Sequence, residues 1–67
     1  MSTSQLQILS RREVEVLTSL SRSTLYALVG RGEFPTPIRL LPTRSVGWSK
    51  EEVEEWIRAR MAGRGHG

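Results

Sequence analysis

The chain has 67 residues, enough for one domain only, because a chain of about 60 residues buries only about 60% of its unfolded surface. It contains no cysteine, which excludes a disulfide framework and a zinc finger with the usual cysteine ligands. Ten basic residues, nine of them arginine, stand against seven acidic residues. The resulting net charge of +3 mildly favours nucleic acid as a partner.

The hydropathy pattern predicts a single domain without a membrane segment. No apolar run approaches the roughly 20 residues of a membrane span, and the N-terminus lacks the apolar core of a signal peptide. We therefore expect a cytoplasmic protein with no membrane partner. Residues 1–7 are expected to form a flexible arm, residues 8–62 the folded domain and residues 63–67 a disordered tail. His66 lies in that tail without a second ligand nearby, so no cofactor is expected.

The first predicted helix begins at Arg11. The run Ser-Arg-Arg-Glu at residues 10–13 matches a capping box, in which the first and last side chains each bond the other's backbone N–H. Val14 and Leu17 are expected to pack inward, with Val16 on a flank. The pattern stops at residues 18–20, and this three-residue gap is typical of a helix-turn-helix with Leu20 in the corner.

The second predicted helix is bracketed by Ser21 as N-cap and Gly32 as a left-handed stop. Its apolar side holds Leu25, Leu28 and Val29. Its other side is small, polar and basic: Ser23, Ala27 and Gly30, with Tyr26 and Arg31 at the edges. This composition favours a surface that something approaches closely, and the major groove of B-DNA fits. A plain amphipathic core helix is the alternative.

The middle of the chain predicts a β-hairpin. The run Phe-Pro-Thr-Pro at residues 34–37 excludes a helix. Two short runs around residues 38–40 and 46–48 then alternate in hydropathy on either side of an irregular tip. The hairpin is a candidate wing, with Arg39 on the outward face and Arg44 near the tip, placed to contact DNA backbone or a narrow minor groove. Alternatively, the hairpin only covers the core.

The third predicted helix follows a second capping box, Ser-Lys-Glu-Glu at residues 49–52. Glutamates in its first turn and Arg58 and Arg60 near its end agree with the helix dipole. The expected inward stripe is Val53, Trp56, Ile57 and Met61. Trp48 and Trp56 are expected to be core anchors rather than functional residues.

Six segments of the chain also occur together in a known family: Glu-Val at 13–14, Leu-Ser-Arg-Ser-Thr-Leu-Tyr at 20–26, Gly-Glu-Phe-Pro at 32–35, Pro-Ile at 37–38, Arg-Ser-Val-Gly-Trp at 44–48 and Glu-Val-Glu-Glu-Trp-Ile at 52–57. Over residues 8–60 the chain resembles the AlpA family of small prophage regulators. That family is similar to MerR-type and excisionase winged helices, so the expected fold is mainly α with a small β-hairpin, a winged helix-turn-helix.

The resemblance implies sequence-selective binding of double-stranded DNA, with residues 22–24 and Tyr26 in the groove and Arg39 and Arg44 on the wing. The chain departs from the family pattern at three places. Ser19 stands where relatives usually have a turn glycine, which can strain the corner. Ala27 replaces a basic residue, and the tip at residues 41–43 lacks the expected glycine turn.

The pattern and the resemblance together define one candidate DNA-binding set: Arg11, Arg12, Ser21, Arg22, Ser23, Thr24, Tyr26, Arg31, Arg39 and Arg44. The expected function is transcriptional regulation of prophage or mobile-element genes, with self-association on DNA and RNA polymerase or an integrase as further partners. An excisionase-like architectural factor and a small protein-interaction adaptor remain alternatives. An enzyme is disfavoured, because the chain has no cysteine, no aspartate and only a tail histidine.

Overall fold

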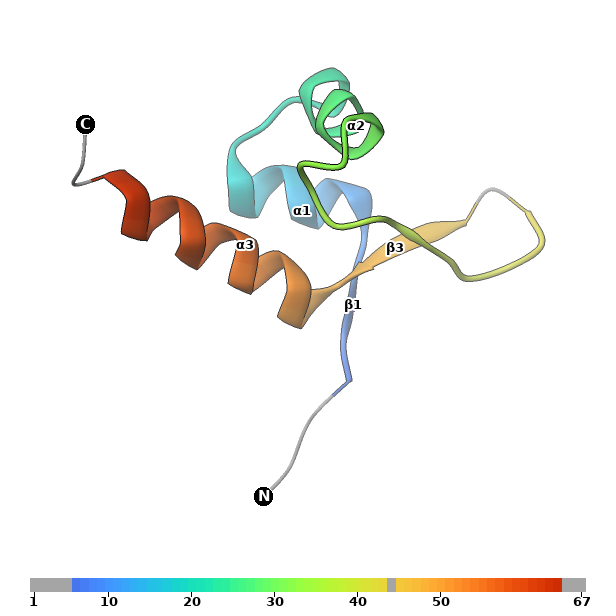
Figure 1. The fold of residues 1–67 in the computed structure, drawn as a ribbon. Helices are drawn as coiled ribbons and strands as arrows, with labels where there is room; N and C mark the ends of the chain where they lie inside the picture. Colours follow the sequence, from blue (N-terminus) through green and yellow to red (C-terminus); the bar gives the residue numbers. More distant parts are fainter. Residues whose placement is uncertain (1–5, 44, 65–67) are drawn as a thin grey trace.

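The computed structural model describes residues 6–43 and 45–64, so the predictions for the rest of the arm, for Arg44 and for His66 lie outside the described residues. The elements follow in the order β1 (Ile8–Leu9), α1 (Arg11–Thr18), α2 (Arg22–Gly30), β2 (Ile38–Arg39), β3 (Val46–Ser49) and α3 (Lys50–Gly63), as Figure 1 shows. The sheet is antiparallel with strand order β1-β3-β2. The predicted mainly α winged helix-turn-helix is confirmed, and β1 adds a third strand to the expected hairpin.

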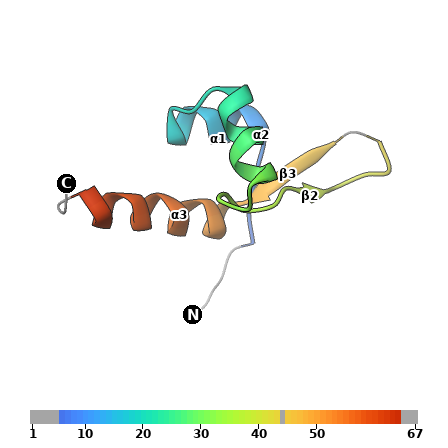
Figure 2. The ribbon, with the colours of Figure 1, turned by 45° about the horizontal axis from the view of Figure 1, so that its top comes forward.

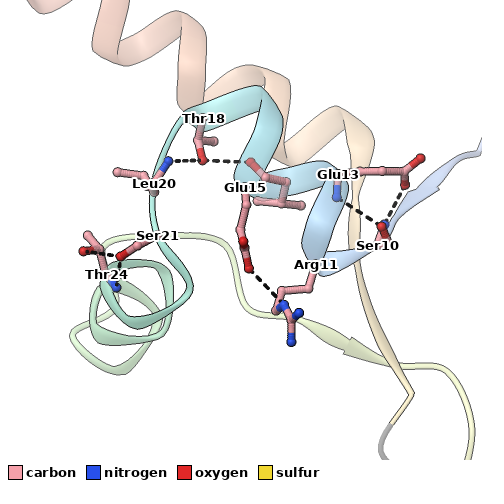
Figure 3. Close-up of polar contacts among 9 residues, drawn as sticks. Ser10, Arg11, Glu13, Glu15, Thr18, Leu20, Ser21 and Thr24 are labelled. Atoms are coloured by element: carbon pink, nitrogen blue, oxygen red, sulfur yellow. Dashed lines mark hydrogen bonds and ion pairs between the residues drawn. The ribbon is translucent and has the colours of Figure 1, made fainter.

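Serine caps start all three helices. At α1 the capping box is complete: Glu13 N donates to Ser10 Oγ at 3.1 Å, and Ser10 N donates to Glu13 Oε1 at 2.8 Å (Figure 3). At α3 the Ser49 hydroxyl accepts from Glu52 N at 3.3 Å, but the described bonds contain no reciprocal one. The second capping box is therefore only half formed, at a serine that also ends β3 opposite Ile8.

The turn between α1 and α2 depends on a left-handed serine. Ser19 has φ 61° and ψ 21°, and its N–H donates to Glu15 O at 2.8 Å, which ends α1. The Thr18 hydroxyl donates to Val14 O at 2.8 Å and accepts from Leu20 N at 3.3 Å (Figure 3). Leu20 is partly buried against the core, so its predicted place in the corner is confirmed.

The core takes one side chain from each of five segments: Val14, Leu25, Phe34, Trp48 and Val53. The Trp48 indole N–H donates to Pro35 O at 2.8 Å, and the Trp56 indole N–H donates to Glu33 O at 2.7 Å. These two bonds hold the segment after α2 against the sheet and α3. The tryptophans therefore act as the predicted core anchors, with buried or half-buried rings whose polar atoms are paired.

The prediction that Leu17 and Met61 pack into the core is wrong. Leu17 is 50% exposed and Met61 is 55% exposed. Only a narrow stripe of α1, centred on Val14, contacts the rest of the domain, so Leu17 lies at its margin. Met61 lies in the C-terminal half of α3, which runs past the sheet and the other helices in both ribbon views (Figures 1 and 2). The domain is too small to cover either side chain.

The hairpin register corrects the expected position of Arg39. Ile38 pairs with Gly47, and Arg39 pairs with Val46, and residues paired across antiparallel strands point to the same sheet face. Arg39 therefore lies on the face of Val46 and Trp48, and not on the opposite, outward face. Alternation within each run does not fix the phase between the two runs, because the irregular tip sets the register.

Candidate nucleic-acid interface

The exposed side of α2 has the small, polar composition expected from the sequence. We call it the α2 face, and its residues are Arg22, Ser23, Tyr26, Ala27 and Gly30, all exposed. On the opposite side of the helix, Leu25 is fully buried and Leu28 and Val29 pack partly against the core. The helix is thus held by its apolar side and presents a surface with little side-chain bulk at its centre. Such a surface permits close approach of another molecule to the helix backbone.

The Tyr26 ring packs against Trp48, a residue of the core. The two rings meet edge to face, with centroids 6.1 Å apart and planes at 61°. The Tyr26 residue remains 39% exposed, so part of the side chain stays accessible at the surface. This contact links α2 to β3 and limits the freedom of Tyr26. Sequence reasoning missed it, since no local pattern relates two residues that far apart in the chain.

The N-terminal end of α2 carries two exposed hydroxyl groups. Ser21 Oγ accepts from Thr24 N at 3.2 Å and donates to Thr24 Oγ1 at 3.0 Å (Figure 3). The predicted cap is therefore confirmed. Because Thr24 Oγ1 accepts the serine proton, its own hydroxyl proton remains to be donated outward. The first turn of a helix also has free backbone N–H groups, which favour an anionic group such as phosphate.

The candidate arginines differ in how far their charge is already paired. Arg12 and Arg22 are exposed, and neither forms an ion pair within the described residues. Arg12 also lines a shallow hollow beside Ser21 at the start of α2. These two guanidinium groups therefore lie beside the N-terminal end of the α2 face without an ion-pair partner among the described residues.

Two other candidates have carboxylate partners. Arg11 Nε lies 2.9 Å from Glu15 Oε2 on α1, and both side chains are partly buried (Figure 3). Arg31 Nε lies 3.4 Å from Glu33 Oε1, both exposed, at the C-terminal end of α2. Sequence reasoning did not weigh these glutamates, although Glu15 stands four residues after Arg11, the spacing of a helical ion pair. Arg11 is therefore the candidate least available to an external anion.

The wing carries Arg39 on the side of the sheet from which α2 rises. The register places Arg39 on the face of Trp48, and Trp48 contacts Tyr26 of α2. The hairpin extends beyond the helices in both ribbon views (Figures 1 and 2), so Arg39 is exposed there. The structure thus brings the α2 face and Arg39 to the same side of the sheet.

A family model described as "Prophage CP4-57 regulatory protein (AlpA)" matches residues 7–61. The chain belongs to the AlpA family. The match runs from the residue before β1 into α3, so it includes the helix-turn-helix, the wing and the closing helix. It confirms the resemblance to the AlpA family that the sequence indicates.

One relative in this comparison comes from a phage. The AlpA-family chain is 46% identical over 55 residues to "Uncharacterized protein ORF88" of Enterobacteria phage P4, and the aligned part is 82% of this chain and 61% of that protein. The chain therefore spans about three fifths of the relative's length. Within the described ranges, none of the helices combines the length and the apolar character that a transmembrane segment requires.

Proposed function

We propose that this AlpA-family chain binds double-stranded DNA sequence-selectively and regulates transcription of prophage or mobile-element genes. The observation that carries the proposal is the α2 face, where small side chains are flanked by free cations and hydroxyls on a helix fixed by its buried leucine. The major groove of B-DNA admits a helix with this surface, and the first turn of the helix then meets base edges and phosphates. Such a regulator would act in the cytoplasm, where the DNA is.

Each candidate has a role that follows from its chemistry. Arg22, in the first turn of α2, is suited to bidentate contact with a guanine edge. Ser23 and Thr24 are short donors for bases or phosphate, and the braced Tyr26 hydroxyl would donate to the backbone. Arg12, Ser21, Arg31 and the wing arginines Arg39 and Arg44 would position the domain through phosphates. Arg11 would contribute least to DNA binding, because it already forms an ion pair with Glu15.

A chain of this size binds DNA weakly as a single copy. Single modules bury only about 600–1,000 Å² of protein surface on DNA, which limits the number of base contacts. We therefore propose cooperative binding of several copies at tandem or inverted sites, touching one another along the duplex. RNA polymerase, or an integrase at a neighbouring site, is the further partner that this arrangement would serve.

The experiment is a genome-wide selection of bound duplexes followed by gel shifts of Arg22→Ala. Loss of a bidentate guanine contact should cost about 1–3 kcal/mol at one base position and relax selectivity there. The matched control is Arg58→Ala, an exposed arginine on α3, which should bind like the parent chain. If the two variants bind alike, the α2 face is not the reading surface.

The selected sites also separate the alternatives. Sites over promoters support the transcriptional regulator. Sites confined to recombination attachment sequences indicate an excisionase-like architectural factor that shapes DNA without acting on RNA polymerase. A chain that no duplex retains at moderate salt is instead an adaptor whose basic surface serves an acidic protein.

A further inference from the structure

A carboxylate lies beside Arg31, at the C-terminal end of α2. Glu33 Oε1 is 3.4 Å from Arg31 Nε, and the side chains of Arg31 and Glu33 are 63% and 53% exposed. Among the described residues, Arg11 is the other candidate arginine with a carboxylate partner, but its pair with Glu15 is less exposed, at 35% and 26%. An approaching polyanion therefore reaches the Arg31–Glu33 pair more easily than the Arg11–Glu15 pair.

The end of α2 fixes the backbone of Glu33. Gly32 has a φ of 74°, and the Glu33 N–H donates back to Leu28 O at 2.8 Å, as in a Schellman motif. The Glu33 carbonyl also accepts the indole N–H of Trp56 at 2.7 Å. Both groups of the peptide backbone at residue 33 are thus paired, and the side chain starts from a fixed point next to Arg31.

Neither packing nor the helix dipole explains a glutamate at this position. The residue after the glycine of a Schellman motif frequently makes an apolar contact with the last turn of the helix, whereas the Glu33 side chain is exposed. The C-terminal end of a helix carries partial negative charge, so a carboxylate there is unfavourable. Among the described residues, the cation that the Glu33 carboxylate contacts is Arg31. The position of Glu33 therefore bears on the availability of that arginine.

We propose that Glu33 competes with DNA phosphate for Arg31 and so keeps the affinity of a single copy low. This inference rests on the proposed DNA binding and concerns its strength. Arg31 directly follows α2, so a helix seated in the major groove brings its guanidinium near the DNA backbone. An exposed ion pair contributes little stability, and a phosphate can therefore replace the Glu33 carboxylate. The displaced carboxylate then remains close to the negatively charged backbone and opposes binding.

A low affinity of each copy favours sites that gather several copies. Phosphate contacts strengthen binding to every duplex without reading its sequence. Copies that touch along one duplex gain from their neighbours, because attachment raises their effective concentration, and a lone copy has no such gain. By weakening every copy equally, Glu33 leaves stable occupancy to sites with several copies.

The proposal is tested with Glu33→Gln and a short duplex that holds one copy, by fluorescence anisotropy at increasing salt. Without its carboxylate partner, Arg31 should neutralise one more phosphate, so the salt slope should steepen by about 0.9. Glu33→Gln should bind several-fold more tightly than the parent chain at about 50 mM salt, and this gain should shrink about 3–4-fold by about 200 mM. Selected and scrambled duplexes should show the same gain, because phosphates carry no sequence information.

The matched control is Glu55→Gln, which removes the same charge from an exposed residue of α3. Within the described part of the chain Glu55 forms no ion pair, so this variant should keep the salt slope of the parent chain. Arg31→Ala in the Glu33→Gln background should abolish the gain. Circular dichroism should report the parent fold for every variant, since the side chains of Arg31 and Glu33 are exposed.

Equal salt slopes for Glu33→Gln and Glu55→Gln would overturn the proposal and leave the proposed function intact. A gain that survives Arg31→Ala would also overturn it, since Glu33 would then repel phosphates without involving Arg31. A gain confined to the selected duplex would place Arg31 on a base edge, which contradicts competition for phosphate. A parent chain that binds neither duplex would defeat the proposed function, and with it any role of Glu33 in DNA binding.

Discussion

At the residue scale, Ser19 has a backbone conformation that disfavours its side chain. Its φ of 61° lies in the left-handed region, where a residue with a Cβ is less stable than glycine by roughly 1–2 kcal/mol. The sequence predicted this point of strain, since Ser19 stands where relatives usually have glycine. Ser19 lies in the short turn that joins α1 to α2.

Ser19→Gly should therefore raise the free energy of unfolding by about 0.5–1 kcal/mol, since relief of strain exceeds the entropy that glycine adds to the unfolded chain. Thermal or urea unfolding measures the change. The matched control is Ser23→Gly, the same substitution in the first turn of α2, which should lower stability by less than about 0.5 kcal/mol, because serine is already a weaker helix former than alanine. A lower stability for Ser19→Gly would show that the turn is not strained.

At the element scale, local signals predicted the three helices and the β2–β3 hairpin but missed strand β1. Serine caps and dipole-matched charges lie within a few residues of one another, so they revealed the starts of α1, α2 and α3. Strand β1 has two residues and exists only by pairing with β3, which no short-range pattern shows. The faces of the hairpin depended on the register, which is likewise non-local.

Gly47 allows β1 to lie close against β3, because it has no Cβ. A Cβ at this position would collide with Ile8 Cγ2 and lie 3.1 Å from Leu9 O, a backbone atom of β1. Gly47→Ala should therefore cost about 1–3 kcal/mol through overpacking, measured by chemical denaturation. Gly63→Ala serves as the control, because no atom lies within 4 Å of that added Cβ, and it should cause no loss. Equal stability of the two variants would contradict the close packing of β1 on β3.

At the scale of the whole molecule, a small core positions one helix. The core is a single cluster of buried side chains from α1, α2, β3, α3 and the linker at Phe34. The indole N–H groups of Trp48 and Trp56 donate to backbone carbonyls of the segment after α2 and hold it in place. The α2 face was largely predictable, because apolar residues lie on one side of α2 and small, polar and basic residues lie on the other. What escaped prediction were contacts between distant segments, the Tyr26–Trp48 pair and the pairing of β1 with β3. The ion pair of Arg31 with Glu33 was also missed, although its residues are only two positions apart.

The central claim is that the α2 face and Arg39 of the wing contact the same DNA duplex. The most direct measurement is an NMR titration of the isotope-labelled chain with a selected duplex. We expect the largest amide shift changes at Arg22, Ser23, Tyr26 and Arg39. Ile8, Ile38 and the C-terminal half of α3 should be nearly unchanged. Changes concentrated on α3 or around Ile8 and Ile38, with α2 unaffected, would contradict the account.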